Sequence, residues 1–111
     1  MTIVVTGANG HIGNNLVRAL VEAGEDVRAV MHTGTRALEG VAAEQVQADV
    51  LDPDSLTRAF QSAELVYHLA GHISIVPYES GRMQRINVQG TRNAVQAAIA
   101  CGVRRLVYTS S

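Results

Sequence analysis

The fold is decided by the stretch Thr2-Ile3-Val4-Val5-Thr6-Gly7-Ala8-Asn9-Gly10-His11-Ile12-Gly13. A β-branched run, typical of a buried strand, leads into regularly spaced glycines and then into a helical pattern. Gly7 is expected to permit a tight turn, Gly10 to let backbone amides approach a pyrophosphate, and Gly13 to let the helix pack closely on the sheet. The helix start offers unpaired N–H groups and a positive dipole end to phosphates. The stretch therefore predicts a dinucleotide-binding strand–turn–helix; the alternative is a glycine-rich turn without a ligand.

Helical patterns occur in three further parts of the chain. A helix is predicted from His11 to about Ala23 because apolar residues recur on one side before Gly24. Asp52 and Pro53 form an N-cap followed by a proline at the first helical position. The helix that they open carries apolar residues at helical spacing, namely Leu56, Ala59, Phe60 and Ala63. A long helix is predicted from Gly81 to Cys101, and the stretch His32–Glu44 reads as a loop with a short helix.

Strand patterns alternate with these helices. The predicted strands are Thr2–Thr6, Asp26–Met31, Gln45–Asp49, Leu65–Leu69 and Arg105–Thr109. Such alternation predicts an α/β fold in which helices cover both faces of a doubly wound parallel sheet. The expected strand order is 3-2-1-4-5, and the pattern ends after the fifth strand. A ligand would then lie between the first and fourth strands, where the winding reverses.

Composition limits the remaining function classes. The chain has 111 residues, 47% hydrophobic and 17% charged, which predicts a single domain over residues 1–111. A net charge of −1 argues against nucleic acid as a partner. No apolar run approaches the roughly 18 residues that span a bilayer, and no leader pattern precedes the first strand, so no membrane contact is predicted. The single cysteine, Cys101, excludes an internal disulfide and favours a reducing, cytoplasmic compartment.

Four further motifs follow the opening stretch in order along the chain. They are Asp49-Val50-Leu51-Asp52, Tyr67-His68-Leu69-Ala70-Gly71, Asn87-Val88-Gln89-Gly90-Thr91-Arg92-Asn93 and Leu106-Val107-Tyr108-Thr109-Ser110-Ser111. With these motifs the whole chain resembles the N-terminal, Rossmann-type part of the extended short-chain dehydrogenase/reductase superfamily. Its run from His68 to Ile75 is most similar to the branch of dihydroflavonol-reductase-like enzymes and sugar-nucleotide epimerases.

This resemblance implies which residues contact an NAD(P) cofactor. The pyrophosphate would be held by Gly7, Asn9, Gly10, His11, Ile12 and Gly13. Asp49 and Val50 would hold the adenine, and the Asn-rich helix motif would supply a structural asparagine. The nicotinamide side would be lined by Leu69, Ala70 and Gly71. Ser111 matches the catalytic serine that polarises the substrate carbonyl.

One part of the family's machinery is missing from this sequence. Enzymes of the superfamily use a Tyr-x-x-x-Lys pair to move a proton while hydride passes to or from nicotinamide. All nine basic residues here are arginines, so the pair cannot exist, and Ser111 is the last residue. The simplest interpretation is the truncated cofactor-binding portion of a reductase or epimerase, without turnover of its own. The alternatives are a minimal or engineered Rossmann scaffold or nucleotide-sensing module, and a chain that folds without binding a ligand.

The choice between NAD and NADP depends on the end of the second strand. A carboxylate there would bind the ribose 2′-hydroxyl of NAD, whereas a basic residue would accept the 2′-phosphate of NADP. The position falls near His32, and no carboxylate occurs between Ala29 and Leu38. This favours NADP, with Arg36 as a candidate phosphate partner. The alternative is that Arg36 is a solvated loop residue.

Two other patterns allow either a structural or a functional interpretation. His68 and His72 are four residues apart, but the first lies on a strand and no third ligand is in view, so no metal site is predicted. His68 is expected to be a strand residue whose ring nitrogens form hydrogen bonds with neighbouring residues. The 81–101 helix carries a small-residue face for packing and a second apolar line of Val88, Val95 and Ile99. We expect self-association through this second line or through the open edge of the fifth strand.

Overall fold

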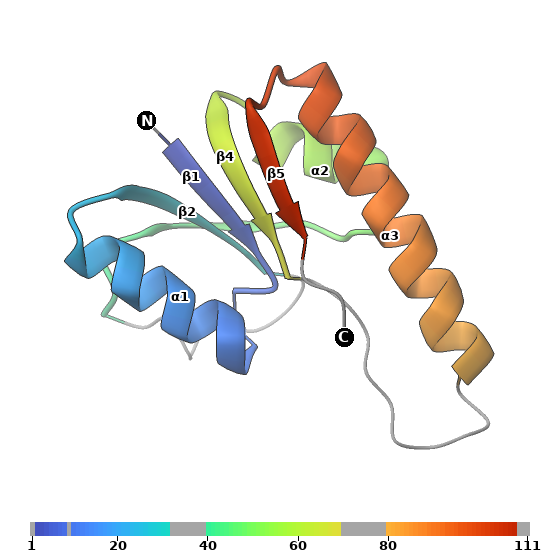
Figure 1. Ribbon diagram of the computed structural model, residues 1–111, viewed down its shortest axis with the longest axis horizontal. Helices are drawn as coiled ribbons and strands as arrows, with labels where there is room; N and C mark the ends of the chain where they lie inside the picture. The colour runs from blue at the N-terminus through green and yellow to red at the C-terminus, as the bar shows by residue number, and fades with distance from the viewer. Residues whose placement is uncertain (1, 9, 32–39, 70–79, 109–111) are drawn as a thin grey trace.

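The computed structural model describes residues 2–8, 10–31, 40–69 and 80–108, with the backbone alone for His11 and residues 80–87. Five parallel strands form a sheet in the order β3-β2-β1-β4-β5 (Figure 1). The strands are β1 (Thr2–Thr6), β2 (Asp26–Met31), β3 (Glu44–Gln47), β4 (Ala63–His68) and β5 (Arg105–Tyr108). The helices are α1 (His11–Glu22), α2 (Pro53–Ala59) and α3 (Ser80–Ala100). The predicted Rossmann-type topology is thereby confirmed.

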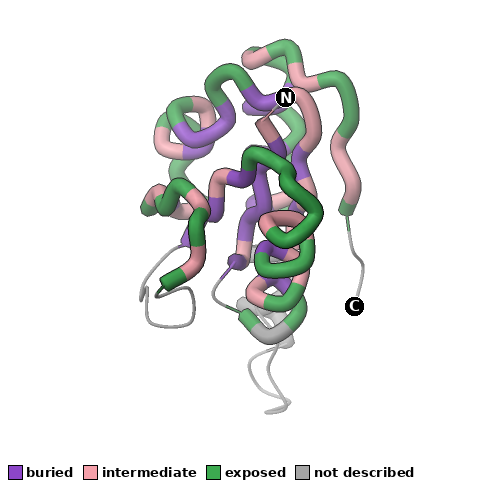
Figure 2. Tube along the Cα trace, turned by 90° about the vertical axis from the view of Figure 1, so that its left-hand side faces the viewer, coloured by how far each residue is buried: buried purple, intermediate pink, exposed green. Residues whose placement is uncertain are grey.

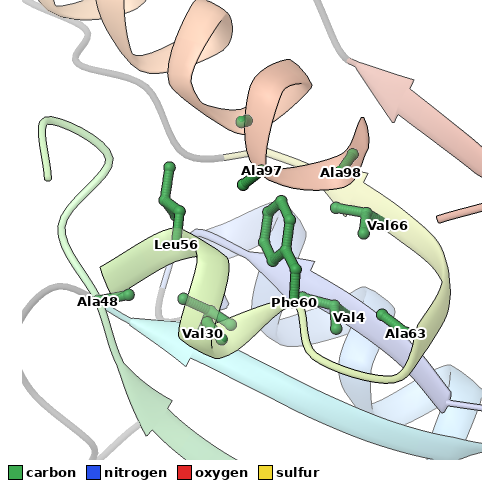
Figure 3. Packing of buried hydrophobic residues seen from close by; sticks show 11 residues of the cluster. Val4, Val30, Ala48, Leu56, Phe60, Ala63, Val66, Ala97 and Ala98 are labelled. Atoms are coloured by element: carbon green, nitrogen blue, oxygen red, sulfur yellow. The ribbon is translucent and has the colours of Figure 1, made fainter. Parts of the chain in front are cut away.

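Helices cover both faces of the sheet because successive strand residues point to opposite sides (Figure 1). Val5 of β1 belongs to a buried cluster that includes Val17 of α1. Its neighbour Val4 belongs to a second cluster on the other face, under α2 and α3. In Figure 3 the ring of Phe60, at the end of α2, lies in this second cluster with Val66 and Ala97. Buried residues accordingly follow the central strands β1, β2 and β4, and exposed residues follow the outer sides of the helices (Figure 2).

The starts of the helices agree closely with the sequence patterns. Asp52 is the N-cap of α2, and its Oδ1 accepts the backbone N–H of Asp54 at 3.2 Å. Pro53 occupies the first turn, as expected. The long helix α3 is displaced by one residue from the predicted span. Its small-residue face packs as predicted, because Gly90, Ala94 and Ala97 are buried.

The prediction that Ala63 belongs to the helix opened by Pro53 is wrong. The helix ends at Ala59, Ser62 takes a left-handed conformation with φ of 66°, and Ala63 begins β4. Ala63 is nevertheless apolar because it is buried in the same cluster as Leu56 and Phe60. It enters this cluster from the sheet and not from the helix, so its spacing from Leu56 only imitates a helical pattern.

The bounds of two strands also differ from the sequence prediction. β4 begins two residues earlier than Leu65 and ends before Leu69. β3 ends at Gln47 rather than at Asp49, because Asp49 enters a hydrogen-bonded turn. In that turn its side-chain Oδ1 accepts the N–H of Leu51 at 2.9 Å and its carbonyl accepts the N–H of Asp52 at 2.9 Å. The acidic motif therefore lies on a turn just beyond the carboxyl end of the strand.

Candidate functional site

The turn after β1 leads directly into α1. Gly7 has a φ of 67°, a left-handed conformation that suits glycine, and its carbonyl accepts the N–H of Gly10 at 3.0 Å. Gly10 is the N-cap of α1, and within the described structure no side-chain hydrogen bond caps this helix. The first hydrogen bond along the helix joins Asn14 N–H to the Gly10 carbonyl at 2.8 Å. The N–H groups ahead of Asn14 lack intrahelical acceptors, so this end of α1 can accept an anion.

Gly13 determines how closely α1 approaches the turn. A Cβ atom added at Gly13 would lie 2.2 Å from the Gly7 carbonyl oxygen and 3.0 Å from the Ala8 Cα. Only glycine fits this contact without movement of the backbone. The close packing that the sequence predicts at Gly13 is therefore present, and the surface that Gly13 meets is the turn after β1. Ile12, beside it in the first turn, is 68% exposed.

The carboxyl ends of β1 and β4 are joined by side chains. The Oγ1 of Thr6 lies 2.9 Å from His68 Nδ1 and accepts the backbone N–H of Leu69 at 3.0 Å. These contacts place Leu69, predicted to line the cofactor, beside the residue that precedes Gly7. Thr6 is a residue of this candidate site to which the sequence motifs assigned no role. The β-branched strand pattern explains its presence equally well, so no local signal distinguishes it.

His68 is buried at the same place. Its ring stacks on Tyr108 of β5 with the centroids 5.9 Å apart, and only 1% of the residue is exposed. Burial lowers the pKa of His68 from its ordinary value of 6.5 to about 4, so the ring is neutral at physiological pH. The expectation that its neighbours satisfy His68 is met at Nδ1. Its Nε2 has no hydrogen-bond partner among the residues that the structure describes.

The Asp49–Asp52 turn is the second part of the candidate site. Ser55 stabilises it from the start of α2, because its Oγ accepts the Asp49 N–H and donates towards the Asp49 and Asp52 carbonyls. The carbonyl of Val50 accepts a hydrogen bond of 2.8 Å from Nδ2 of Asn93 in α3. Asn93 of the long-helix motif thus contacts this turn, whereas the side chain of Asn87, the first asparagine of the motif, is not described.

Several predicted positions lie outside the described residues or contribute only backbone. Asn9, His32, Arg36, Ala70, Gly71 and Ser111 lie outside them, as does His72, and the side chain of His11 is not described. Among the described residues no group of three or more His, Cys, Asp or Glu side chains is arranged to hold a metal ion. Within the same residues, no helix has the length and apolar character required to cross a membrane.

Curated relatives match this chain over nearly its whole length. Sterol demethylase protein B of Methylococcus capsulatus is 44% identical, with 100% of this chain and 34% of the relative covered. The putative dihydroflavonol 4-reductase of Synechocystis sp. is 38% identical, with 96% of this chain and 32% of the relative covered. The chain therefore spans about one third of the length of these relatives.

Solved structures show the same arrangement. A short-chain dehydrogenase/reductase superfamily protein from Agrobacterium tumefaciens, solved with NAD bound, superposes with a TM-score of 0.85 at 36% identity over 100% of this chain and 33% of its own. UDP-glucose 4-epimerase from Thermotoga maritima superposes with a TM-score of 0.89 at 28% identity over 100% of this chain and 38% of its own.

These likenesses place the chain among the extended short-chain dehydrogenases/reductases, and the chain corresponds to their nucleotide-binding portion. The sequence profile of the 3-beta hydroxysteroid dehydrogenase/isomerase family matches residues 4–111. With the β3-β2-β1-β4-β5 sheet and the glycine turn that opens α1, this match covers nearly every element of the chain. The chain belongs to the 3-beta hydroxysteroid dehydrogenase/isomerase family.

Proposed function

We propose that the chain binds an NAD(P) cofactor across the carboxyl ends of β1 and β4. The observation that carries this proposal is the N-terminus of α1, which no described side chain caps and which the close contact of Gly13 with the Gly7 turn positions. The pyrophosphate lies against Gly7, Asn9, Gly10, His11, Ile12 and Gly13, where backbone N–H groups and the helix dipole favour negative charge. Family members solved with NAD bound support the cofactor class.

The two ends of the cofactor lie on opposite sides of this turn. Asp49 and Val50 hold the adenine, which is supported by their position just beyond the carboxyl end of β3. Leu69 lies towards the nicotinamide, since Thr6 ties its backbone to the end of β1. Ala70 and Gly71 follow it in the sequence and complete this side of the cofactor.

The 2′-position of the adenine ribose distinguishes the two cofactors. We propose a preference for NADP, with His32 near the ribose and Arg36 paired with the 2′-phosphate. Its support is the absence of a carboxylate from the sequence between Ala29 and Leu38.

For the protein of which this chain forms part, we propose hydride transfer to or from a carbonyl or hydroxyl carbon. Ser111 is the remnant of its catalytic group, and residues 1–111 form one cofactor-binding domain. The alternative function is a nucleotide-sensing or scaffold module without activity. The lone cysteine, Cys101, supports a reducing, cytoplasmic setting.

Replacing Gly10 tests the proposed function. In calorimetric titrations we expect the chain to bind NADP and NAD, and the Gly10→Val variant to lose at least about tenfold in affinity. The valine side chain would stand at the N-cap, where an added Cβ would lie 3.3 Å from the Gly7 carbonyl oxygen, and it would obstruct the approach of the phosphates. Ala100→Val, at an exposed position at the end of α3, is the matched control and should bind normally.

Binding by the parent chain and the control, lost in Gly10→Val, would establish a dinucleotide module. Tighter binding of NADP than NAD would support Arg36 as the phosphate partner. Absence of binding by the parent chain would contradict the proposed function and leave the scaffold alternative.

We also propose that two copies of the chain associate through α3. On this helix Val88, Val95 and Ile99 are 52%, 38% and 75% exposed, and they form the second apolar line. Light scattering should show a mass that increases with concentration, and Ile99→Glu should return it to that of a monomer. Gln96→Glu adds the same charge at an exposed position of α3 and should leave association unchanged. A dimer that persists in Ile99→Glu would favour the open edge of β5 instead.

A further inference from the structure

The turn at Asp49–Asp52 is held by a chain of hydrogen bonds that begins on α3. Gln89 Nε2 donates to Asn93 Oδ1 at 2.9 Å, and Asn93 Nδ2 donates to the Val50 carbonyl at 2.8 Å. The N–H of the same Val50–Leu51 peptide donates to Asp49 Oδ1 at 2.9 Å. The Asn93 amide and the Asp49 carboxylate therefore bind opposite ends of one peptide group.

The direction of these bonds leaves Asn93 a single useful orientation. A carbonyl oxygen only accepts hydrogen bonds, so the NH₂ group of Asn93 has to face Val50. Its Oδ1 then faces Gln89, whose NH₂ group supplies the donor. Asn93 is only 2% exposed, so water does not readily replace either partner. Hydrogen bonds arranged in such a chain polarise and orient one another.

The contact of α3 with the turn is also close in space. A Cβ atom added at Gly90 would lie 3.0 Å from Cγ2 and 3.2 Å from Cβ of Val50. Gly90 thus lets the helix backbone approach Val50 to the distance that the short Asn93 side chain can bridge. Gln89, Gly90 and Asn93 lie within one turn of α3, and together they form a single support for the turn.

We infer that Asn93 and Gln89 are positioning residues that make the site select a purine with a 6-amino group. The inference rests on the proposed function, in which Asp49 meets the adenine. A carboxylate accepts a hydrogen bond from the 6-amino group of adenine. The 6-oxo oxygen of hypoxanthine is itself an acceptor, so it forms no hydrogen bond with the carboxylate. This discrimination requires a fixed carboxylate. The Leu51 N–H orients the Asp49 carboxylate, and Asn93 holds the carbonyl of the same peptide group.

The test compares NAD with nicotinamide hypoxanthine dinucleotide, in which a 6-oxo group replaces the 6-amino group of the purine and N1 carries a hydrogen. By calorimetry we expect the chain to bind NAD about tenfold to a hundredfold more tightly, the range for one hydrogen bond to a charged group. Asn93→Leu removes the donor to Val50 and should reduce this ratio to about threefold or less. The decisive quantity is the ratio, because a purely structural loss would weaken both ligands equally.

A second variant avoids the risk that Asn93→Leu does not fold. Gln89 is exposed, so Gln89→Met should fold normally and yet leave the Asn93 amide without the partner that orients it. We expect an intermediate ratio for this variant. Gln96→Met introduces the same change at another exposed position of α3 and should retain the ratio of the parent chain.

The outcomes separate the inference from the proposed function. A reduced ratio in both variants, with the control unchanged, supports Asn93 and Gln89 as positioning residues. A parent chain that binds NAD, with an undiminished ratio in folded Asn93→Leu or in Gln89→Met, overturns the inference and leaves the proposed function intact. A parent chain that binds neither ligand overturns both.

Discussion

Gly13→Ala is expected to destabilise the chain by about 3 kcal/mol and to abolish cofactor binding. The new Cβ would lie 2.2 Å from the Gly7 carbonyl oxygen, 2.9 Å from its carbonyl carbon and 3.0 Å from the Ala8 Cα. All three are backbone atoms, so no side chain can rotate away, and α1 has to move relative to the turn. Because the same turn forms the proposed pyrophosphate site, stability and binding should fall together. Urea unfolding and calorimetry measure the two effects.

Asn15→Ala provides the matched control for this experiment. Asn15 is an exposed residue of the same helix, and its replacement by alanine should change stability by less than about 0.5 kcal/mol. If Gly13→Ala unfolded at the same urea concentration as the parent chain, α1 could move away from the turn without loss of folding free energy. That result would contradict the structural role assigned to Gly13.

His68 should make the stability of the chain depend on pH. Its pKa is lowered to about 4 in the folded state, against an ordinary value of 6.5, because burial disfavours the charged ring. Between these values the unfolded state binds more protons than the folded state, so stability rises with pH. The contribution of the neutral His68 ring to the free energy of unfolding is fully present above about pH 6.5 and is lost as the pH falls towards 4. The expected loss is about 3 kcal/mol.

Urea unfolding at a series of pH values, compared between the parent chain and His68→Asn, measures this contribution. Carboxyl groups titrate in both proteins, so the difference between the two curves isolates the histidine. We expect the difference to be constant above pH 6.5 and to change steadily below it. Parallel curves down to pH 4 would show that His68 is protonated without penalty in the folded chain.

Most of the fold could be predicted from the sequence because its signals are local. Glycines mark the turn that opens α1, Asp52 and Pro53 mark the start of α2, and apolar periodicity separates strands from helices. Ala63 shows the limit of such signals. Its spacing from Leu56 is helical, but a left-handed residue at Ser62 redirects the chain, and burial in a shared core preserves the spacing on a different element.

The candidate site was likewise predictable from the sequence only in part. The glycine turn and the acidic motif are runs of adjacent residues, so the sequence alone determined that a glycine turn follows β1 and that a carboxylate follows β3. The contact of Thr6 with His68 spans 62 residues, and the bond from Asn93 to Val50 spans 43. Only the tertiary structure decided these pairings. Whether two distant polar groups meet depends on strand order and register, and on how closely Gly90 lets α3 approach the turn.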